Sequence, residues 1–262
     1  MSVTFPLAIP LPRSSIDFYF APICLSGIIL YRVYIMHNLW LILIAGIAYL
    51  IGSIPTAYLI TKQVSGKLVW LKGSGNVGAM NVYRTTGSIK LMVLATALDV
   101  GKGALAVFLV QWLGFLGYIP EFALMTAVFF VVLGHNYSLF LKFRGGRGLA
   151  SFLGVLLAVN PIIVPACLGV MFAAILATEC RLKGRLEGGF RRLFNTLGSQ
   201  ILGRVIGLCF CLIPMYLLAP HSFLYLLPGI ALALPKNISR LKAYLQDSAR
   251  HTDKRDVDNK DG

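Results

Sequence analysis

The feature that most constrains this chain is a series of long apolar runs separated by short segments rich in lysine, arginine and glycine. The clearest runs are residues 39–60, 91–116, 122–141, 149–178, 201–218 and 223–234. A helix of about 20 apolar residues crosses the roughly 30 Å of hydrocarbon in a bilayer. Hydrophobic residues make up 57% of the chain and charged residues only 13%, so too few polar side chains remain to cover a water-soluble domain. The sequence therefore predicts an all-α integral membrane protein.

The positions of the lysines and arginines predict how the helices are oriented. The formal net charge is +14, but the cations lie between apolar runs rather than along one face, which argues against a nucleic-acid-binding protein. The run 149–178 is too long for one crossing, and Asn160-Pro161 interrupts it. Two short helices that meet there keep every basic loop on the cytoplasmic side. We therefore expect about seven transmembrane helices, some short or broken, with the amino end outside and the carboxyl end cytoplasmic.

The two ends of the chain differ from its middle. Residues 1–35 form an uncertain N-terminal extension, which is an additional span, a signal-like segment or sequence absent from the mature protein, with Met36 as an internal start. Residues 36–245 are expected to form the membrane domain. Residues 246–262 are expected to be a charged cytoplasmic tail.

The segment 73–84 is a polar, glycine-rich loop in a chain of mostly lipid-compatible sequence. Such dense polar residues are costly in hydrocarbon, so they must line water or a polar ligand. Glycines expose backbone N–H groups and permit positive φ, and Arg84 adds a permanent positive charge. The segment predicts a phosphate site at a membrane face. The alternative is a glycine-rich connection whose arginine only sets the topology.

Ionisable residues also occur inside the apolar runs. Asp99 and Lys102 are three residues apart on one helical face, where they can pair, and such residues within a membrane mark a functional site by default. A structural ion pair, or a lysine that extends to the interface, is the alternative. His135 and Asn136 close the next run, either as part of the same site or as packing residues.

A second polar segment, 142–148, precedes the run that begins at Leu149. Its cations are Lys142, Arg144 and Arg147, and its glycines are Gly145, Gly146 and Gly148. Backbone amides at a helix N-terminus together with cations form an anion-binding site. The pattern GxxxxGK[ST] of nucleotide-binding P-loops is absent. The five cysteines have no CxxC pair and no nearby histidine, so we interpret them as packing residues and predict no metal site.

In their order and spacing these motifs resemble the bacterial acyl-phosphate-dependent glycerol-3-phosphate acyltransferases. The resemblance covers about residues 39–161 and resumes at 193–199 and 237–241. It implies a seven-helix enzyme of the bacterial inner membrane that acts in phospholipid biosynthesis. Such an enzyme moves a fatty acyl group from acyl-phosphate to the sn-1 hydroxyl of glycerol 3-phosphate, giving lysophosphatidic acid. The resemblance implies no cofactor and no metal, membrane lipid as the surroundings, and no defined oligomeric state beyond compatibility with a monomer.

The resemblance also implies roles for individual residues. Ser74 and Arg84 match the essential serine and arginine of the family's first motif, and Lys102 matches its buried substrate-contacting lysine. With His135 they form the predicted catalytic set. The predicted substrate-binding set is Gly73, Gly75, Asn76, Asn81, Asp99, Asn136, Lys142, Arg144, Gly145, Gly146, Arg147, Gly148, Ser199 and Asn237.

We interpret Ser74 as a hydrogen-bonding ligand of the substrate. A serine nucleophile that His135 activates, giving an acyl-enzyme, is the alternative. The ligand is preferred because no Asp or Glu occupies an evident position to orient His135, and because a glycine-rich loop suits ligand wrapping.

The chain departs from the family pattern at several positions. Leu234 and Pro235 stand where the third motif has His and Arg, and Gln246 stands where it has Glu. Met80 replaces a usual threonine. Arginines at 144 and 147 replace lysines, and residues 179–191 resemble an insertion. These changes leave open an inactive scaffold relative, and an organic-phosphate transporter is the other alternative.

Overall fold

The computed structural model describes residues 15–66, 68, 70, 75–117, 122–183 and 201–258. All of the regular elements in these ranges are helices, and one isolated β-bridge joins Ser138 to Arg144. The elements are α1 (Ser15–Ser53), α2 (Thr56–Ser65), α3 (Ala79–Thr86), α4 (Ile89–Phe115), α5 (Ala123–Asn136), the 3-10 helix η2 (Leu139–Leu141), α6 (Leu149–Val159), α7 (Ile163–Lys183), α9 (Leu202–Phe210), α10 (Leu212–Leu218) and α11 (Pro220–Asp258). The predicted all-α class is confirmed.

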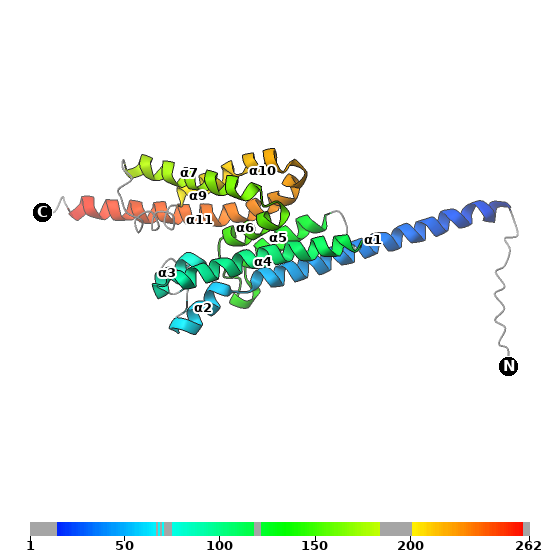
Figure 1. The fold of residues 1–262 in the computed structure, drawn as a ribbon, viewed down its shortest axis with the longest axis horizontal. Coiled ribbons are helices and arrows are strands. Elements are labelled where there is room, and N and C mark those ends of the chain that lie inside the picture. Colours follow the sequence, from blue (N-terminus) through cyan, green and yellow to red (C-terminus); the bar gives the residue numbers. More distant parts are fainter. Residues whose placement is uncertain are drawn as a thin grey trace.

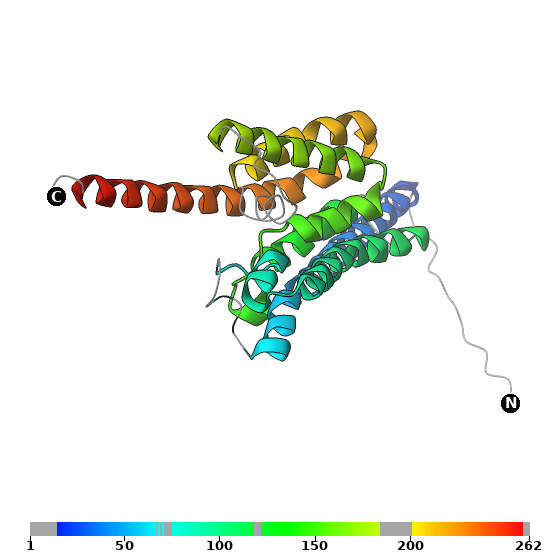
Figure 2. The same cartoon turned by 60° about the vertical axis from the view of Figure 1, so that its left-hand side comes forward.

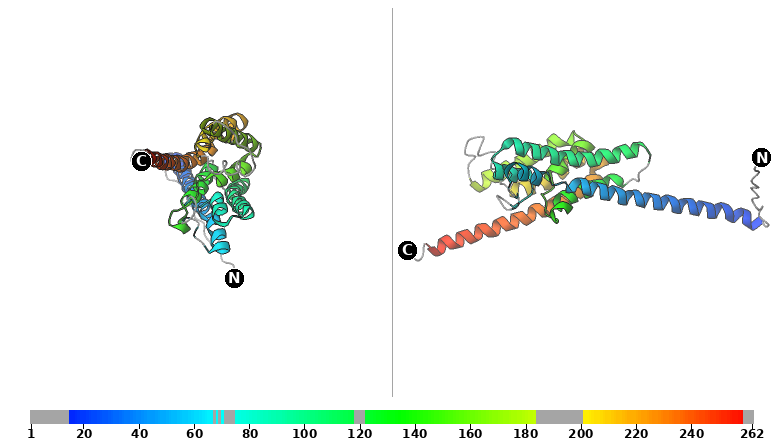
Figure 3. Two further views of the ribbon diagram at one scale, coloured as in Figure 1. Left: turned by 90° about the vertical axis from the view of Figure 1, so that its left-hand side faces the viewer. Right: turned by 90° about the horizontal axis from the view of Figure 1, so that it is seen from below.

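The helices pack in two groups that α11 joins. In the first group α1 lies against α5 and α4 against α6, and in the second α7 packs on α9 and α10 (Figures 1 and 2). Helix α11 contacts α5 of the first group and α9 of the second. Its carboxyl-terminal half and the amino-terminal half of α1 extend from the bundle in opposite directions (Figure 3). Helix α3 lies at the end of the bundle from which α11 extends (Figure 1).

Several helices have the length and composition of membrane spans. Among the described residues, Tyr31–Ser65, Ile89–Phe115 and Ile163–Arg181 are long and apolar enough to cross a bilayer, and three shorter apolar stretches accompany them. Large apolar side chains point away from the bundle, such as Ile42 on α1 and Trp112 on α4. An outer surface of this kind suits lipid rather than water. The chain is thus a multi-pass membrane protein, and the number of crossings and the sides of the termini stay predictions.

The first predicted span, residues 39–60, lies within the apolar stretch Tyr31–Ser65 and is interrupted near its end. Helix α1 ends at Ser53 and α2 begins at Thr56, because Pro55 has no N–H to donate and disfavours helical backbone at Ile54. The Ile54 carbonyl accepts a hydrogen bond from Nζ of Lys102 at 3.1 Å. The break in the helix therefore supplies a polar group to the centre of the bundle.

The predicted break at Asn160-Pro161 is confirmed. Helix α6 ends at Val159 and α7 begins at Ile163. Oδ1 of Asn160 accepts a hydrogen bond from the backbone N–H of Ile162 at 3.0 Å. This side chain therefore satisfies one of the donors that the start of α7 leaves without a helical partner.

Helices α4 and α6 approach each other closely through glycine. A methyl group at Gly103 would collide with the carbonyl oxygen of Ser151, and one at Gly154 would collide with the carbonyl of Val100. Small residues allow such close backbone contact between membrane helices. The contact fixes the start of α6 beside the polar residues of α4.

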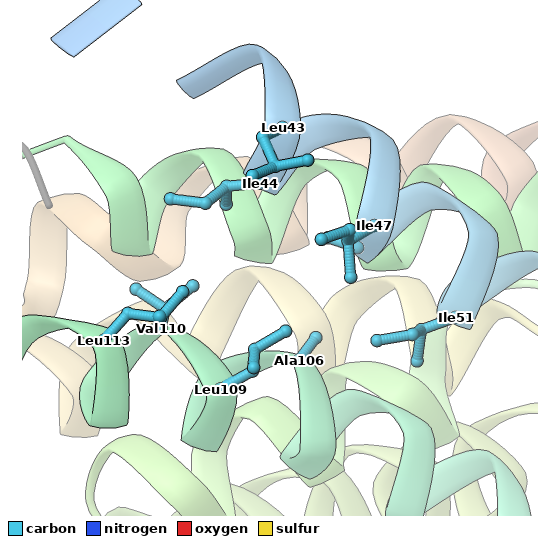
Figure 4. Close-up of a pocket in the computed structure, with 9 residues that line it drawn as sticks. Leu43, Ile44, Ile47, Ile51, Ala106, Leu109, Val110 and Leu113 are labelled. Atoms are coloured by element: carbon cyan, nitrogen blue, oxygen red, sulfur yellow. The ribbon is translucent and has the colours of Figure 1, made fainter. Parts of the chain in front are cut away.

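Helices α1 and α4 pack less tightly than α4 and α6. Ile44, Ile47 and Ile51 of α1 face Ala106 and Val110 of α4 across a cavity of about 20 Å³ (Figure 4). An apolar cavity of this size has room for about one water molecule and no polar partner for it. We interpret it as a packing gap.

Three predicted boundaries fall within or beside helices. Helix α1 passes through Met36 and α11 passes through residue 246 without a break, with Pro228 and Pro235 inside α11. The start at Met36 and the division at 245 stay predictions. Of the predicted insertion 179–191, residues up to Lys183 continue α7, and the rest lies outside the described residues.

Candidate functional site

The centre of the site is the carboxylate of Asp99, which is buried in α4. Its Oδ1 lies 2.8 Å from Nζ of Lys102 and accepts a hydrogen bond from Oγ1 of Thr56 at 2.6 Å. The predicted pairing of Asp99 and Lys102 is confirmed. A buried ion pair needs such additional hydrogen bonds, because removing two charges from water costs several kcal/mol per ion.

His135 reaches the same carboxylate from α5. Its Nδ1 lies 3.5 Å from Oδ1 of Asp99 without a hydrogen bond between them, and the imidazole is buried. The sequence offered no Asp or Glu at an evident position to orient His135, and the structure places the Asp99 carboxylate beside it. Asp99 and His135 are distant in the sequence, and only the packing of α4 against α5 brings them together.

Gly145 and Gly146 hold the second polar segment against the end of α5. The N–H of Gly146 donates to the carbonyl of His135 at 2.9 Å. A methyl group at Gly146 would overlap the His135 imidazole, and one at Gly145 would overlap the carbonyl oxygens of His135 and Asn136. A larger residue at either position would therefore clash with atoms of α5. Their predicted role as the surface that a phosphate approaches stays a proposal.

A cavity of about 150 Å³ opens next to Asp99 and His135. Residues 76–84 contribute polar and basic groups to its lining, and the start of α6, Arg147 and Arg204 also contribute to it. The lining residues are Asn76, Gly78, Ala79, Met80, Asn81, Arg84, Asp99, His135, Arg147, Leu149, Ala150 and Arg204. Of the predicted site residues, the cavity brings together Asn76, Asn81, Arg84, Asp99, His135 and Arg147.

Three helices begin at this cavity. The residue before the first turn is Gly78 for α3, Gly148 for α6 and Ile201 for α9, and none of the three caps its helix with a side chain. The helix dipole makes these helix starts positive, and no side chain of the preceding residue offsets that charge. Residues of all three first turns line the cavity. An anion is the ligand that such an arrangement favours.

Positive side chains add to the positive charge of the helix starts. Arg84 stands in the last turn of α3 and is exposed to solvent at the cavity, whereas Arg147 is partly buried. Burial, together with the charges of Arg240 and Arg84, lowers the pKa of Arg147 to about 10. The cations crowd one another, so a bound anion relieves their repulsion.

Lys102 lies behind the main cavity. It lines an adjoining cavity of about 10 Å³ with Asp99 and His135, and its ammonium already binds Asp99 and the carbonyl of Ile54. This geometry favours the structural alternative for Lys102, in which the lysine holds Asp99 in place. A direct contact with substrate stays a prediction.

Asn136 joins α5 to α11. Its Nδ2 donates to the carbonyl of Leu232 at 2.9 Å, and its own carbonyl accepts from Nζ of Lys236 at 2.8 Å. The side chain of Asn136 is fully buried and its Oδ1 has no hydrogen-bond partner. Asn237 is also fully buried and donates to the carbonyl of Ala233 at 2.8 Å within α11. Substrate contacts of both asparagines stay predictions.

Lys142 and Arg144 point away from the cavity's lining. Both are exposed, and the guanidinium of Arg144 lies 5.9 Å from the ring centre of Trp70, which stacks on Tyr58 at 5.0 Å. Backbone φ angles of 52° at Lys142 and 61° at Phe143 produce the tight turn that directs Arg144 there. The sequence alone predicted the same role for Arg144 and Arg147.

The remaining predicted residues belong to the glycine-rich loops. Gly75 adopts a φ of 68° and Gly148 a φ of 83°, which are left-handed conformations that glycine permits. Gly73 and Ser74 lie outside the described residues, and so does Ser199. Their roles stay predictions.

Three groups of the site were missing from the sequence interpretation. Thr56 and the carbonyl of Ile54 bind Asp99 and Lys102, and only the helix break at Pro55 places them there. Arg204 is different, because it is a lone cation in the apolar run 201–218. The rule that marks ionisable residues inside apolar runs applies to it as it does to Asp99.

Comparisons with known proteins identify the family of this chain. The sequence profile described as "Glycerol-3-phosphate acyltransferase" matches residues 42–243. The chain is 37% identical over 169 residues to a glycerol-3-phosphate acyltransferase of Clostridioides difficile, covering 64% of this chain and 82% of the relative. It is 35% identical over 209 residues to that of Carboxydothermus hydrogenoformans, covering 78% and 93%.

A solved structure shares the fold. It is the glycerol 3-phosphate form of PlsY (YgiH), an integral membrane glycerol 3-phosphate acyltransferase, with a TM-score of 0.62 and 25% identity over 79% of this chain and 92% of that one. The lysophosphatidic acid form of the same protein gives a TM-score of 0.60. The profile match alone covers well over half of the chain. The chain therefore belongs to the glycerol-3-phosphate acyltransferase family.

Proposed function

We propose that this protein transfers a fatty acyl group from acyl-phosphate to the sn-1 hydroxyl of glycerol 3-phosphate in the bacterial inner membrane. The products are lysophosphatidic acid and orthophosphate. The observation that carries the proposal is the cavity of about 150 Å³ where three uncapped helix starts and arginines surround a space next to Asp99 and His135. Both substrates carry a phosphoryl group, which such a cavity favours.

The chemistry needs little beyond positioning and charge. The sn-1 hydroxyl oxygen attacks the acyl carbonyl carbon, the new ester bond forms, and the bond from the acyl carbon to the phosphate oxygen breaks. Phosphate is a good leaving group, and the arginines and helix starts stabilise the charge that it takes up. The hydroxyl proton passes to His135 or to the departing phosphate.

In the first of these routes His135 is the base. With Nδ1 toward the Asp99 carboxylate, the neutral imidazole carries its proton on Nδ1 and keeps Nε2 as the acceptor. Asp99 then stabilises the imidazolium that forms. Lys102 and Thr56 hold the carboxylate and act through it.

Ser74 is proposed as a hydrogen-bonding ligand of the substrate. The competing acyl-enzyme route makes Ser74 the nucleophile. Incubation with radiolabelled acyl-phosphate, followed by denaturing electrophoresis, distinguishes the two. The ligand role predicts no covalent label on the protein, and label that disappears in Ser74→Ala would establish the acyl-enzyme instead.

The activity test uses purified protein in detergent with acyl-phosphate and glycerol 3-phosphate. We expect lysophosphatidic acid and orthophosphate in a one-to-one ratio, and no product when acyl-CoA replaces acyl-phosphate. His135→Ala is the matched control, because it retains the arginines of the cavity. A folded protein that forms no lysophosphatidic acid but carries glycerol 3-phosphate into sealed vesicles would be a transporter. Failure of both assays would indicate a scaffold. Separation of inner and outer membranes tests the location.

A further inference from the structure

Arg204 occupies an unusual place for a cation. It is the third residue of α9 (Leu202–Phe210), whose start has no side-chain cap. A positive side chain in the first turn opposes the helix dipole, so the helix itself disfavours it there. Residues around it in the run 201–218 are mostly apolar. Interactions outside α9 therefore hold this cation, and it lines the cavity of the proposed active site.

The contact of α9 with α7 determines where Arg204 points. A methyl group at Gly203 would come within 2.5 Å of Oγ1 of Thr178 and 2.6 Å of Cα of Ile175, and one at Gly207 within 3.0 Å of Cα of Met171. One face of α9 is therefore pressed against α7. Arg204 follows Gly203 directly and lies at the cavity of the proposed active site.

The negative charge of the two substrates favours a third cation at the cavity. Two phosphoryl groups carry about −3 to −4 together at pH 7. Lys102 is paired with Asp99, so Arg84 and Arg147 are the cations that the sequence interpretation provides at the cavity. Their charges sum to two, fewer than two phosphoryl groups require.

We propose that Arg204 is a phosphate-binding residue of this cavity, and that its guanidinium donates to a phosphoryl oxygen of a substrate. The proposal rests on the proposed function. A bound phosphoryl group would offset both the helix dipole at the start of α9 and the repulsion among Arg84, Arg147 and Arg204. Guanidinium groups bind phosphoryl oxygens in pairs of parallel hydrogen bonds, which lysine does not reproduce.

The test compares three variants of the full-length protein in detergent. Arg204→Gln removes the charge, and Arg204→Lys keeps the charge but loses the paired geometry. Arg181→Gln is the control, because Arg181 is an exposed arginine of α7 and does not line this cavity. For each variant we measure the KM of both substrates, the binding of orthophosphate by calorimetry, and the melting temperature.

We expect Arg204→Gln to weaken orthophosphate binding and to raise the KM of one substrate by roughly tenfold or more. Arg204→Lys is expected to raise the same KM by a smaller factor, and Arg181→Gln to leave all values unchanged. The substrate whose KM rises identifies which phosphoryl group Arg204 binds. If Arg204→Gln does not fold, Arg204→Lys decides by the same measurements.

Folded Arg204 variants with unchanged KM values and unchanged orthophosphate binding would overturn the proposal. Failure of the proposed function is a different result. Wild-type protein would then form no lysophosphatidic acid, while orthophosphate binding, and its loss in Arg204→Gln, would still support Arg204 as a phosphate-binding residue.

Discussion

Oδ1 of Asp99 lies 2.8 Å from Nζ of Lys102, one turn further along α4, and both side chains are buried. The same oxygen accepts a hydrogen bond from the hydroxyl of Thr56 and faces His135. One carboxylate thus connects the start of α2, the middle of α4 and the end of α5. The predicted ion pair therefore lies where these three helices meet.

The first prediction concerns Asp99→Asn. It leaves the buried ammonium of Lys102 without its counter-charge, and losing one partner of a buried pair costs about 3 kcal/mol or more. We expect a lower free energy of unfolding in detergent and a large loss of kcat. The double variant Asp99→Asn/Lys102→Met is expected to recover part of the stability. Equal stability of wild type and Asp99→Asn would show that the pair is not structural.

The second prediction concerns Gly146→Ala. The added methyl group would overlap the imidazole of His135, so His135 must move from its place between Asp99 and the cavity. We expect kcat to fall about as far as in His135→Ala, with no further loss in the double variant. Gly46→Ala is the control, because nothing lies near its added methyl group. A change in the KM of glycerol 3-phosphate alone would instead support direct phosphate contact at Gly146.

Much of the fold follows from local chemistry that the sequence displays. Proline interrupts helical hydrogen bonding wherever it stands in an apolar run, so the break at Asn160-Pro161 could be predicted. The same rule accounts for the interruption at Pro55, where the structure has separate helices on either side. The polarity of Asp99 and Lys102 within an apolar run likewise marked the site before any contact was known.

Contacts between distant segments could not be predicted in the same way. The approach of His135 to Asp99 depends on how α5 packs against α4, which no local pattern encodes. The two arginines 144 and 147 look equivalent in the sequence, but the turn at Lys142-Phe143 directs Arg144 to Trp70 and leaves Arg147 at the cavity. Arg204 becomes part of the cavity only when α9 is placed.

The third prediction concerns the close contact of α4 and α6. Gly103→Ala places a methyl group against the carbonyl of Ser151, so the helices must separate. Overpacking of this kind costs typically about 1–3 kcal/mol. We expect a lower melting temperature and reduced activity, because the start of α6 lines the cavity. Gly46→Ala again serves as the control, and an equal effect of both substitutions would contradict the close contact.

The fourth prediction concerns Arg147→Gln. The lowered pKa of Arg147, about 10, means that the folded protein disfavours the protonated side chain. Below pH 10 this lowers stability, and the penalty disappears only as Arg147 loses its proton at higher pH. We therefore expect Arg147→Gln to raise the melting temperature of ligand-free protein at pH 7. The same variant is expected to gain less stability from added orthophosphate. A lower melting temperature without ligand would contradict the crowding of cations.

The fifth prediction concerns Arg84→Ala. If Arg84 holds phosphoryl charge in the transition state, its loss should lower kcat/KM by roughly 100-fold, which corresponds to about 3 kcal/mol. Lys90→Ala is the control, because Lys90 is an exposed cation at the nearby start of α4. Near-normal turnover in Arg84→Ala would remove Arg84 from the site.

The most direct measurement is an experimental structure of this protein with glycerol 3-phosphate bound. The account predicts the phosphoryl group at the starts of α3, α6 and α9, within hydrogen-bond distance of Arg84 or Arg147, and the sn-1 hydroxyl toward His135. A phosphoryl group bound elsewhere, with this cavity left to water, would contradict it.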